Sequence, residues 1–266
     1  MAIVALAAGT GCSLLVTTDG LAAGTGTIDR GPEKLAEAGA TDGTPMPEAA
    51  TDAASPPFCA SLSMKPKFCA DFDTGSLADL GSLTGMVTLD GTTSKSPTGS
   101  LACVVPTGSA KRGAHIEHDF GETPSAYDLS FDVFVDTYDT TLDVELVTVR
   151  FTPAGGGSCV TDISIRDTVW TLDESCESGG AQTLSVSHAA PLAAQTGRWV
   201  HIDASVSFAP SRTYSLAVDG QPLFSALPLQ AALMTAPVTL VMGITYTQVG
   251  ATTAKVHLDN VRFDYR

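Results

Sequence analysis

The chain is poor in positive charge. Its 266 residues include 14 Lys and Arg against 29 Asp and Glu, which gives a formal net charge of −15. Nucleic acids and anionic lipid surfaces attract basic residues, so this balance argues against both as electrostatic partners. Charged residues make up only 16% of the chain and aromatic residues 6%, while Gly, Thr, Val and Ser are frequent. That composition favours β structure over a helical bundle.

Several signatures of membrane insertion or chemistry are missing. The sequence has no stretch of about 20 apolar residues that could span a bilayer. It has no Cys-x-x-Cys pair of the kind that binds zinc, and no Gly-x-Ser-x-Gly of a serine hydrolase. The sequence alone therefore names neither a nucleophile nor a substrate.

Residues 1–12 are typical of an export signal that ends in a lipidation site. A short apolar run is followed by Gly9-Thr10-Gly11-Cys12, which resembles a bacterial lipobox whose Cys becomes the lipidated N-terminus. No Lys or Arg precedes Cys12, and we expect the true start codon to lie upstream. The alternative is an ordinary apolar N-terminus with a chance Cys.

Residues 13–57 have the composition of a tether. They are rich in Gly, Ala, Thr, Pro and acidic residues, and aromatic residues are missing from them. Such a segment cannot bury enough apolar surface to fold, so we predict a disordered linker. With one lipid on Cys12, the chain would be membrane-anchored and exported, in the periplasm, on the outer membrane or at the cell surface.

Five of the six Cys residues follow the tether. Cys59 and Cys69 flank the start of the folded domain, and Cys159 and Cys176 flank a predicted hairpin. In an exported chain we predict a disulfide within each pair, although spacing alone does not fix connectivity. Cys103 lies in an apolar strand and is expected to be a buried free thiol.

Residues 58–266 form one predicted domain. Apolar and polar residues alternate over residues 127–135, 200–208, 214–218 and 238–246, which is the pattern of half-buried antiparallel strands. Asp219-Gly220 is a strong hairpin signal. In the last strand the apolar parity switches at Asp259-Asn260, which requires a bulge if both apolar sets face the core. An all-β, two-sheet antiparallel sandwich is the predicted fold.

Three segments carry a resemblance to a known family. Residues 197–225 (GRWVHIDASVSFAPSRTYSLAVDGQPLFS) resemble the central strands of laminin-G-like, concanavalin A-like jelly rolls. The opening FCADFD (68–73) and the closing LDNVRFDY (258–265) resemble the paired first and last strands of that fold. The whole layout is similar to bacterial lipoproteins with such a domain. The resemblance implies the jelly-roll fold but not an activity, because the fold hosts glycan binders, protein-binding modules, hydrolases and lyases.

Enzymes of this fold supply two patterns to look for. Its retaining glucanases carry Glu-x-Asp-x-x-Glu on one strand, and the nearest run here, Asp143-Val144-Glu145, lacks the third carboxylate. Its lyases use a His and a Tyr around a bound acidic sugar, with a basic residue to neutralise the sugar. His115 and His201 fall on the polar sides of their strands, beside Glu117 and Asp203, and are the candidates; a solvated acidic face is the alternative, and it would repel polyuronates.

A polar stripe runs over several predicted strands. Its members are His115, Glu117, Asp119, Asp128, Asp132, Asp136, Asp143, Glu145, His201 and Asp203. If these strands are neighbours, the stripe forms one hydrophilic face. A sugar-binding face also needs exposed aromatic rings, for which Tyr138 and Trp170 are candidates. The binding candidates are therefore His115, Glu117, Asp132, Tyr138, Trp170 and His201.

A structural calcium ion is a further hypothesis. Asp71, Asp73 and Asp259 would come together if the first and last strands pair, and calcium takes several oxygen ligands. Related jelly rolls carry such an ion near the sheet edge. The alternative is three exposed acids at strand ends.

The sequence-based prediction of function is a lipid-anchored envelope protein whose jelly-roll domain binds a glycan or protein ligand without catalysis. We expect it to act as a monomer and without another cofactor. The first alternative is a polysaccharide-processing enzyme of the same fold, a lyase or a glycoside hydrolase. The second alternative is a structural envelope protein.

Overall fold

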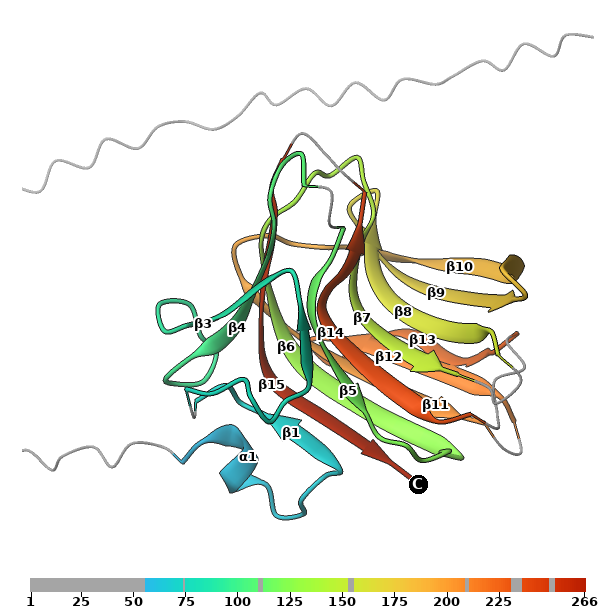
Figure 1. Cartoon of the computed structure of the whole chain (residues 1–266), viewed down its shortest axis with the longest axis horizontal. Helices are drawn as coiled ribbons and strands as arrows, with labels where there is room; N and C mark the ends of the chain where they lie inside the picture. The colour runs from blue at the N-terminus through green and yellow to red at the C-terminus, as the bar shows by residue number, and fades with distance from the viewer. Residues whose placement is uncertain are drawn as a thin grey trace, which may run out of the picture. The chain divides into compact units, whose positions relative to one another are not determined.

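The computed structural model describes residues 56–266, except residue 74 and residues 110–111, 153–155, 209–210, 231–235 and 249–251. The signal-like segment, Cys12 and most of the tether thus lie outside the described residues. The described part forms one short helix and fifteen strands, arranged in two antiparallel sheets (Figure 1). No helix within it is long and apolar enough to cross a membrane. The predicted all-β sandwich is confirmed.

One sheet, sheet A, contains the first and last strands of the domain. Its spatial order is β13-β12-β11-β6-β15-β4-β3, and β1 also pairs with β15. The strands are β1 (Phe68–Ala70), β3 (Met86–Asp90), β4 (Ser100–Val105), β6 (Ala126–Thr137), β11 (Trp199–Ser207), β12 (Thr213–Val218), β13 (Gln221–Pro228) and β15 (Ala254–Tyr265). Phe68 lies opposite Phe263, so the expected pairing of first and last strands is confirmed.

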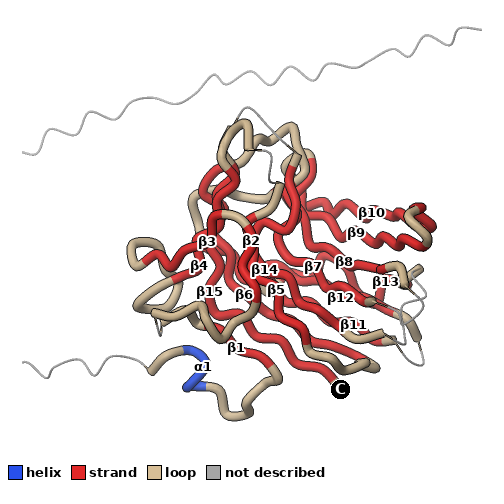
Figure 2. Tube along the Cα trace, viewed as in Figure 1, coloured by secondary structure: helices blue, strands red, loops and turns tan. Residues whose placement is uncertain are grey.

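The other sheet, sheet B, has the order β10-β9-β8-β7-β14-β5-β2. Its strands are β2 (Ser82–Thr84), β5 (Ala114–Asp119), β7 (Val144–Phe151), β8 (Ser158–Arg166), β9 (Val169–Ser178), β10 (Ala181–Ala193) and β14 (Val238–Thr247). The helix, α1 (Phe58–Ser61), is one turn that precedes β1 (Figure 2).

The core lies between the two sheets and is made by the alternating apolar residues. In β6 the buried set is Tyr127, Leu129, Phe131, Val133 and Val135. In β11 and just beyond it the buried set is Val200, Ile202, Ala204, Val206 and Phe208. Burial of these side chains removes apolar area from water and is the main driving force for bringing the sheets together.

The alternation fails at the end of β14. Val238, Leu240, Met242 and Ile244 face the core as predicted, but the register with β7 shifts between Met242 and Tyr246. Tyr246 then lies opposite Glu145, which is on the outer side of β7. The irregularity therefore turns Tyr246 out of the core, contrary to the periodic pattern.

The predicted bulge in β15 is confirmed. The register with β6 shifts between Asp259 and Arg262, and Asn260 has a positive φ of 52°. Leu258 before the bulge and Val261 after it are both buried. The inserted residue thus lets both apolar parities face the core.

Both expected disulfides are present. Cys59–Cys69 ties α1 to β1, and Cys159–Cys176 joins the neighbouring strands β8 and β9. Cys103 is a buried free thiol, as expected. Burial raises the pKa of this thiol to about 12, so it is not a reactive thiolate.

Candidate functional site

The polar stripe expected from the sequence is not one surface. His115 and Glu117 lie on β5 of sheet B, whereas Asp132 and His201 lie on β6 and β11 of sheet A. Each sheet turns its apolar side to the shared core, so the two polar sides point away from each other. The expectation of a single face is corrected for this reason.

We call the outward side of the central strands of sheet B the polar face of sheet B. Its members are His115, Glu117, Glu145, Thr148, Arg150, Asp162, Ser164, Arg166, Asp173 and Tyr246. Several are buried although they point away from the core; His115 is 8% exposed and Asp162 is 5% exposed. Other members are partly exposed: the side chains of Glu117 and Arg150 are 29% and 36% exposed, so the face is open to solvent there.

Three residues of this face form one electrostatic cluster. Nε2 of His115 lies 3.3 Å from Oε1 of Glu117, and the Arg150 guanidinium lies 3.6 Å from the same oxygen. Nδ1 of His115 is 3.3 Å from the carbonyl oxygen of Ile244, which can only accept, so Nδ1 carries a proton. Nε2 is then the ring nitrogen that faces Glu117 on this side of the sheet.

Tyr246 has a basic partner on the same face. The Arg112 guanidinium donates a 2.7 Å hydrogen bond to the Tyr246 hydroxyl oxygen. Because that oxygen accepts from Arg112, its own O–H proton is available to another acceptor. The cross-strand pairing with Glu145 places Tyr246 beside the carboxyl groups of β7 and β8.

A group of carboxyls occupies the centre of the face. Thr148 donates a hydrogen bond to Asp162, and Ser164 donates one of 2.9 Å to Asp173. Burial, followed by the nearby charges of Asp162 and Asp173, raises the pKa of Glu145 to about 8. Burial is also the main cause that raises the pKa of Asp162, to about 7.

One cation balances part of this negative charge. The Arg166 guanidinium lies 2.9 Å from Asp143 and 3.6 Å from Asp173. With the raised pKa values of Glu145 and Asp162, the face carries less negative charge at neutral pH than its sequence implies.

Two expected sugar-binding aromatic residues are not available on a surface. Trp170 is 1% exposed and belongs to the core, because it lies on the inward side of β9. Tyr138 is 7% exposed and also packs in the core cluster. A buried ring cannot stack on a sugar, so both expectations are corrected.

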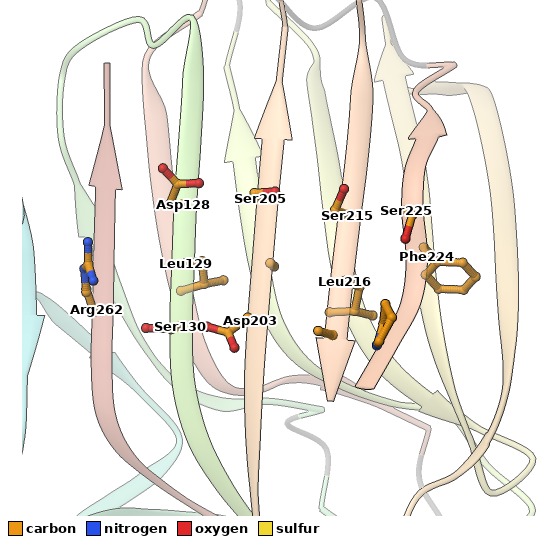
Figure 3. A pocket seen from close by; sticks show the side chains of 13 residues that line it. Asp128, Leu129, Ser130, Asp203, Ser205, Ser215, Leu216, Phe224, Ser225 and Arg262 are labelled. Atoms are coloured by element: carbon orange, nitrogen blue, oxygen red, sulfur yellow. The ribbon is translucent and has the colours of Figure 1, made fainter. Parts of the chain in front are cut away.

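His201 and Asp132 meet on the outer face of sheet A. Nδ1 of His201 is 3.0 Å from Asp132, and the Asn260 amide donates a 2.9 Å hydrogen bond to the other oxygen of Asp132. The hydrogen bond to Asp132 is the main cause that raises the pKa of His201. These bonds link β6, β11 and β15, which is a structural role. The neighbouring Asp128 and Asp203 line a pocket on this face (Figure 3).

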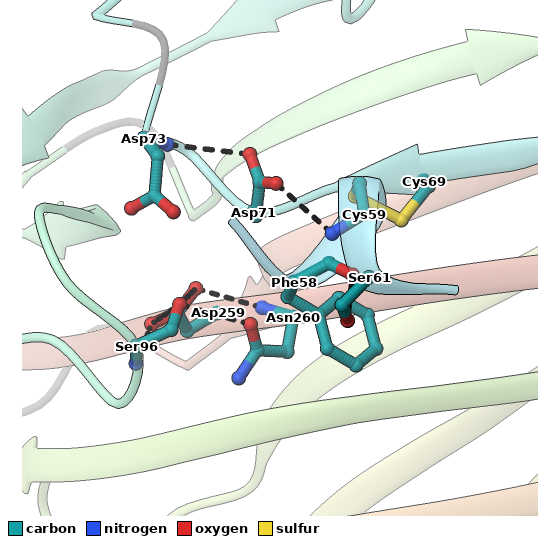
Figure 4. Close-up of a disulfide and its surroundings, with 9 residues drawn as sticks. All are labelled: Phe58, Cys59, Ser61, Cys69, Asp71, Asp73, Ser96, Asp259 and Asn260. Carbon is teal, nitrogen blue, oxygen red and sulfur yellow. Dashed lines mark hydrogen bonds between the residues drawn. A yellow bond between two sulfur atoms is a disulfide. The ribbon is translucent and has the colours of Figure 1, made fainter. Parts of the chain in front are cut away.

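Each of the three carboxylates of the calcium hypothesis accepts hydrogen bonds from backbone N–H groups, and Asp73 accepts one of 3.2 Å from Gly99 (Figure 4). Asp71 accepts from the backbone N–H of Cys59 and Asp73. Asp259 accepts from the N–H groups of Lys95 and Ser96, at 2.8 and 2.9 Å.

Within the described ranges, no group of three or more His, Cys, Asp or Glu side chains could hold a metal ion. N–H donors repel a cation, so these hydrogen bonds do not fit a calcium site.

Sequence reasoning found His115 and Glu117 but missed Arg150, Asp162 and Tyr246. Arg150 and Asp162 lie on strands whose position in sheet B the sequence does not give. Tyr246 continues the apolar alternation of its strand, so the periodic pattern predicts that it faces the core. The available signal was Gly243, a residue without a side chain in the middle of an apolar strand, which often marks an irregularity.

Comparisons with known proteins support the fold. No protein-family model matches the chain, and no curated protein matches it. An endo-β-1,4-glucuronan lyase from the fungus Trichoderma reesei has a similar structure, with a TM-score of 0.61 at 12% identity over 76% of this chain and 96% of that one. The cellulose induced protein Cip1 is also similar, with a TM-score of 0.51 at 16% identity over 74% of this chain and 96% of that one.

These similarities correct the expected function. The jelly-roll neighbour that matches at a TM-score of 0.61 is a polysaccharide lyase, not a non-catalytic binding module. The prediction of a ligand-binding domain without catalysis is therefore withdrawn, together with the expectation that the chain is not an enzyme.

Proposed function

We propose that this protein is a polysaccharide lyase that cleaves chains at uronic acid units on the polar face of sheet B. The observation that carries the proposal is the grouping of His115, Arg150 and Tyr246 on this one face. These are the residue types that uronate elimination needs: two proton-transfer groups and a cation for the carboxylate. The structural similarity to a glucuronan lyase supports the same reaction class.

The proposed reaction is a β-elimination. Nε2 of His115 takes the proton from C5 of the uronate, the C4–O4 bond breaks, and a C4=C5 double bond forms. Tyr246 gives its hydroxyl proton to the departing O4, so water is not consumed. Arg150 binds the sugar carboxylate, which stabilises the negative charge that develops when C5 loses its proton.

Two neighbours support these roles. Glu117 faces Nε2 of His115 and stabilises the imidazolium that forms after proton transfer. Arg112 donates to the Tyr246 oxygen and stabilises the phenolate left after Tyr246 has given up its proton. Both interactions are charge-assisted in the state that they stabilise.

The acidity of the face does not exclude a polyuronate. Glu145 and Asp162 have pKa values raised to about 8 and about 7, so at pH 6 both carboxyls are largely protonated. A protonated carboxyl donates a hydrogen bond and does not repel the substrate carboxylate.

The test is an assay on glucuronan, alginate and a neutral glucan, followed by ultraviolet absorbance of unsaturated ends. Cleavage of a polyuronate with unsaturated products is expected for the wild type, and His115→Ala and Tyr246→Phe should each lower kcat by roughly 100-fold or more. Asp136→Asn, on β6 of the opposite sheet, is the control and should retain activity. A wild type that produces no unsaturated ends from any polyuronate would overturn the proposal.

A glycoside hydrolase is the second candidate, and the raised pKa values favour it. Glu145, with the higher pKa of about 8, would be the acid. Asp162 on the adjacent strand β8, with the lower pKa of about 7, would be the partner carboxylate once it has lost its proton above neutral pH. The same assay separates the two: reducing ends without unsaturation, lost in Glu145→Gln but not in Tyr246→Phe, identify a hydrolase.

We also propose that the protein works as an exported, monomeric lipoprotein. The lipobox-like Cys12 supports lipidation, and the two disulfides support an oxidising compartment. Mass analysis of the mature N-terminus tests the anchor. Acylated Cys12 as the first residue is expected, and an unmodified Met1 would contradict it.

A further inference from the structure

A pocket of about 290 Å³ lies on the outer face of sheet A, the side opposite the polar face of sheet B. We call it the sheet A pocket. It is formed over β6, β11, β12, β13 and β15 (Figure 3). Its volume is near the lower end of the range of about 300–1,000 Å³ of small-ligand sites.

The hollow arises because small residues form its floor. Ser205 lies opposite Ser215, and Ala217 lies opposite Asp203, so neighbouring strands both present short side chains. Arg262 on β15 stands at one side of this floor, and Pro222 pairs with Ala217 at the other side. Larger residues at the floor positions would fill the space.

The lining offers hydrogen-bonding groups of both kinds at short spacing. Ser130 is opposite Arg262 on one side and Asp203 on the other, which places a hydroxyl between a guanidinium and a carboxylate. At the edge of the pocket, a carboxylate oxygen of Asp203 lies 3.4 Å from Nε2 of His201. A carboxylate oxygen of Asp128 lies 3.0 Å from the guanidinium of Arg266.

The carboxylates and hydroxyls accept and donate in the pattern that vicinal sugar hydroxyls require. The Ala217 and Pro222 side chains supply apolar contact for the C–H groups of a ring.

We infer that the sheet A pocket binds one neutral hexopyranose unit of a polysaccharide, in addition to the proposed catalytic face. The volume matches one or two sugar rings rather than a long chain. Arg266 at the edge is already paired with Asp128, so a uronate carboxylate would find Arg262 as the one other guanidinium, beside the two carboxylates Asp128 and Asp203 that disfavour it. The inference does not rest on the proposed elimination, because a binding measurement tests it without turnover.

The test is a titration of the protein with cellotetraose, mannotetraose and xylotetraose, and with tetraglucuronate for comparison, by calorimetry or NMR. At least one of the two hexose tetrasaccharides is expected to bind with a Kd in the millimolar range or better. Ser205→Phe fills the floor and should weaken this binding at least tenfold. Thr213→Phe, on the next strand and outside the pocket lining, is the matched control and should bind like the wild type.

Asp203→Asn is a second variant that keeps the shape of the pocket and removes one charge. It should weaken binding of the neutral sugar about tenfold and reduce the discrimination against tetraglucuronate. Absence of binding by every hexose tetrasaccharide, or full binding by Ser205→Phe, would overturn the inference. Polyuronate cleavage that persists in Ser205→Phe would show that the two faces act separately, as proposed.

Discussion

The carboxylate of Glu117 lies 3.3 Å from Nε2 of His115, on the outer face of a strand that both residues share. Two positions apart on one strand, their side chains leave the same side of sheet B. The strand itself thus sets the two side chains next to each other, and the strand β7 adds Arg150 from the side. This local pairing explains why the sequence could identify His115 and Glu117 but not their cationic neighbour.

Replacing Glu117 tests whether this pairing serves proton transfer. Glu117→Gln keeps the shape but removes the charge that stabilises the imidazolium, so we expect kcat on a polyuronate to fall roughly 10- to 100-fold. KM should stay the same or fall, because Arg150 loses a competing carboxylate. Steady-state kinetics measures both. An unchanged kcat with a raised KM would show that Glu117 only holds the substrate.

Glu145 should make the fold less stable as the pH rises. Its pKa is raised from 4.5 to about 8 by burial and by nearby carboxylates. Between these values the folded chain holds a proton that the unfolded chain has released, so the free energy of unfolding falls as the pH increases. Glu145→Gln removes this ionisation and should be more stable than the wild type by about 2–4 kcal/mol at pH 9.

The wild type and Glu145→Gln should be almost equally stable at pH 4, because Glu145 is then largely protonated in both the folded and the unfolded wild type. Denaturant unfolding at several pH values between 4 and 9 measures the difference. Glu122→Gln is the control for loss of one exposed negative charge. A stability gain for Glu145→Gln that does not vary with pH would contradict the explanation.

The Cys159–Cys176 disulfide should contribute to stability through the hairpin that it closes. The two residues are 17 positions apart, and a loop of about this length predicts a contribution of about 3 kcal/mol. The double variant Cys159→Ser/Cys176→Ser should lose that amount in denaturant unfolding. A reductant should lower the stability of the wild type by breaking both disulfides. In the double variant it can break only Cys59–Cys69, so the loss of stability should be smaller.

Much of the fold could be predicted from local patterns. Period-two alternation located β6 and β11, Asp219-Gly220 marked the β12–β13 hairpin, and the parity switch at Asp259 marked the bulge in β15. Each of these signals lies within a few residues of the feature that it predicts.

The candidate site could be predicted only in part, because it depends on which strands are neighbours. No local pattern indicates that the strands of His115 and His201 belong to different sheets, so the sequence predicts one polar face where the structure has two. Trp170 is one of few aromatic candidates for a sugar-binding surface in the sequence, yet its side chain points into the core. Strand order is set by long-range packing, which local periodicity does not record.

Removing calcium should leave the fold unchanged. Asp259 is 0% exposed and is held by N–H donors from the loop before β4, so the carboxylate needs no cation in this arrangement. We expect the same melting temperature with excess EDTA as with added calcium. A lower melting temperature in EDTA that calcium restores would show that an ion binds here. Asp259→Asn removes the acceptor and should lower the melting temperature under both conditions.

The bulged end of β14 depends on Gly243. Its φ is +128°, and a Cβ atom there would lie 2.5 Å from the carbonyl oxygen of Ala114 and 2.7 Å from Sγ of Cys103. Gly243→Ala therefore adds both backbone strain and a steric clash, and we expect a loss of about 2–4 kcal/mol in the free energy of unfolding.

Gly220→Ala is the matched control for Gly243→Ala. Gly220 also has a positive φ, of 74°, but a Cβ atom there meets nothing within 4 Å, so only strain of about 1 kcal/mol is expected. Since the irregularity beyond Gly243 turns Tyr246 outward, Gly243→Ala should also lower kcat, whereas Gly220→Ala should not. Equal stability losses in the two variants would show that close backbone approach does not hold this part of the sheet.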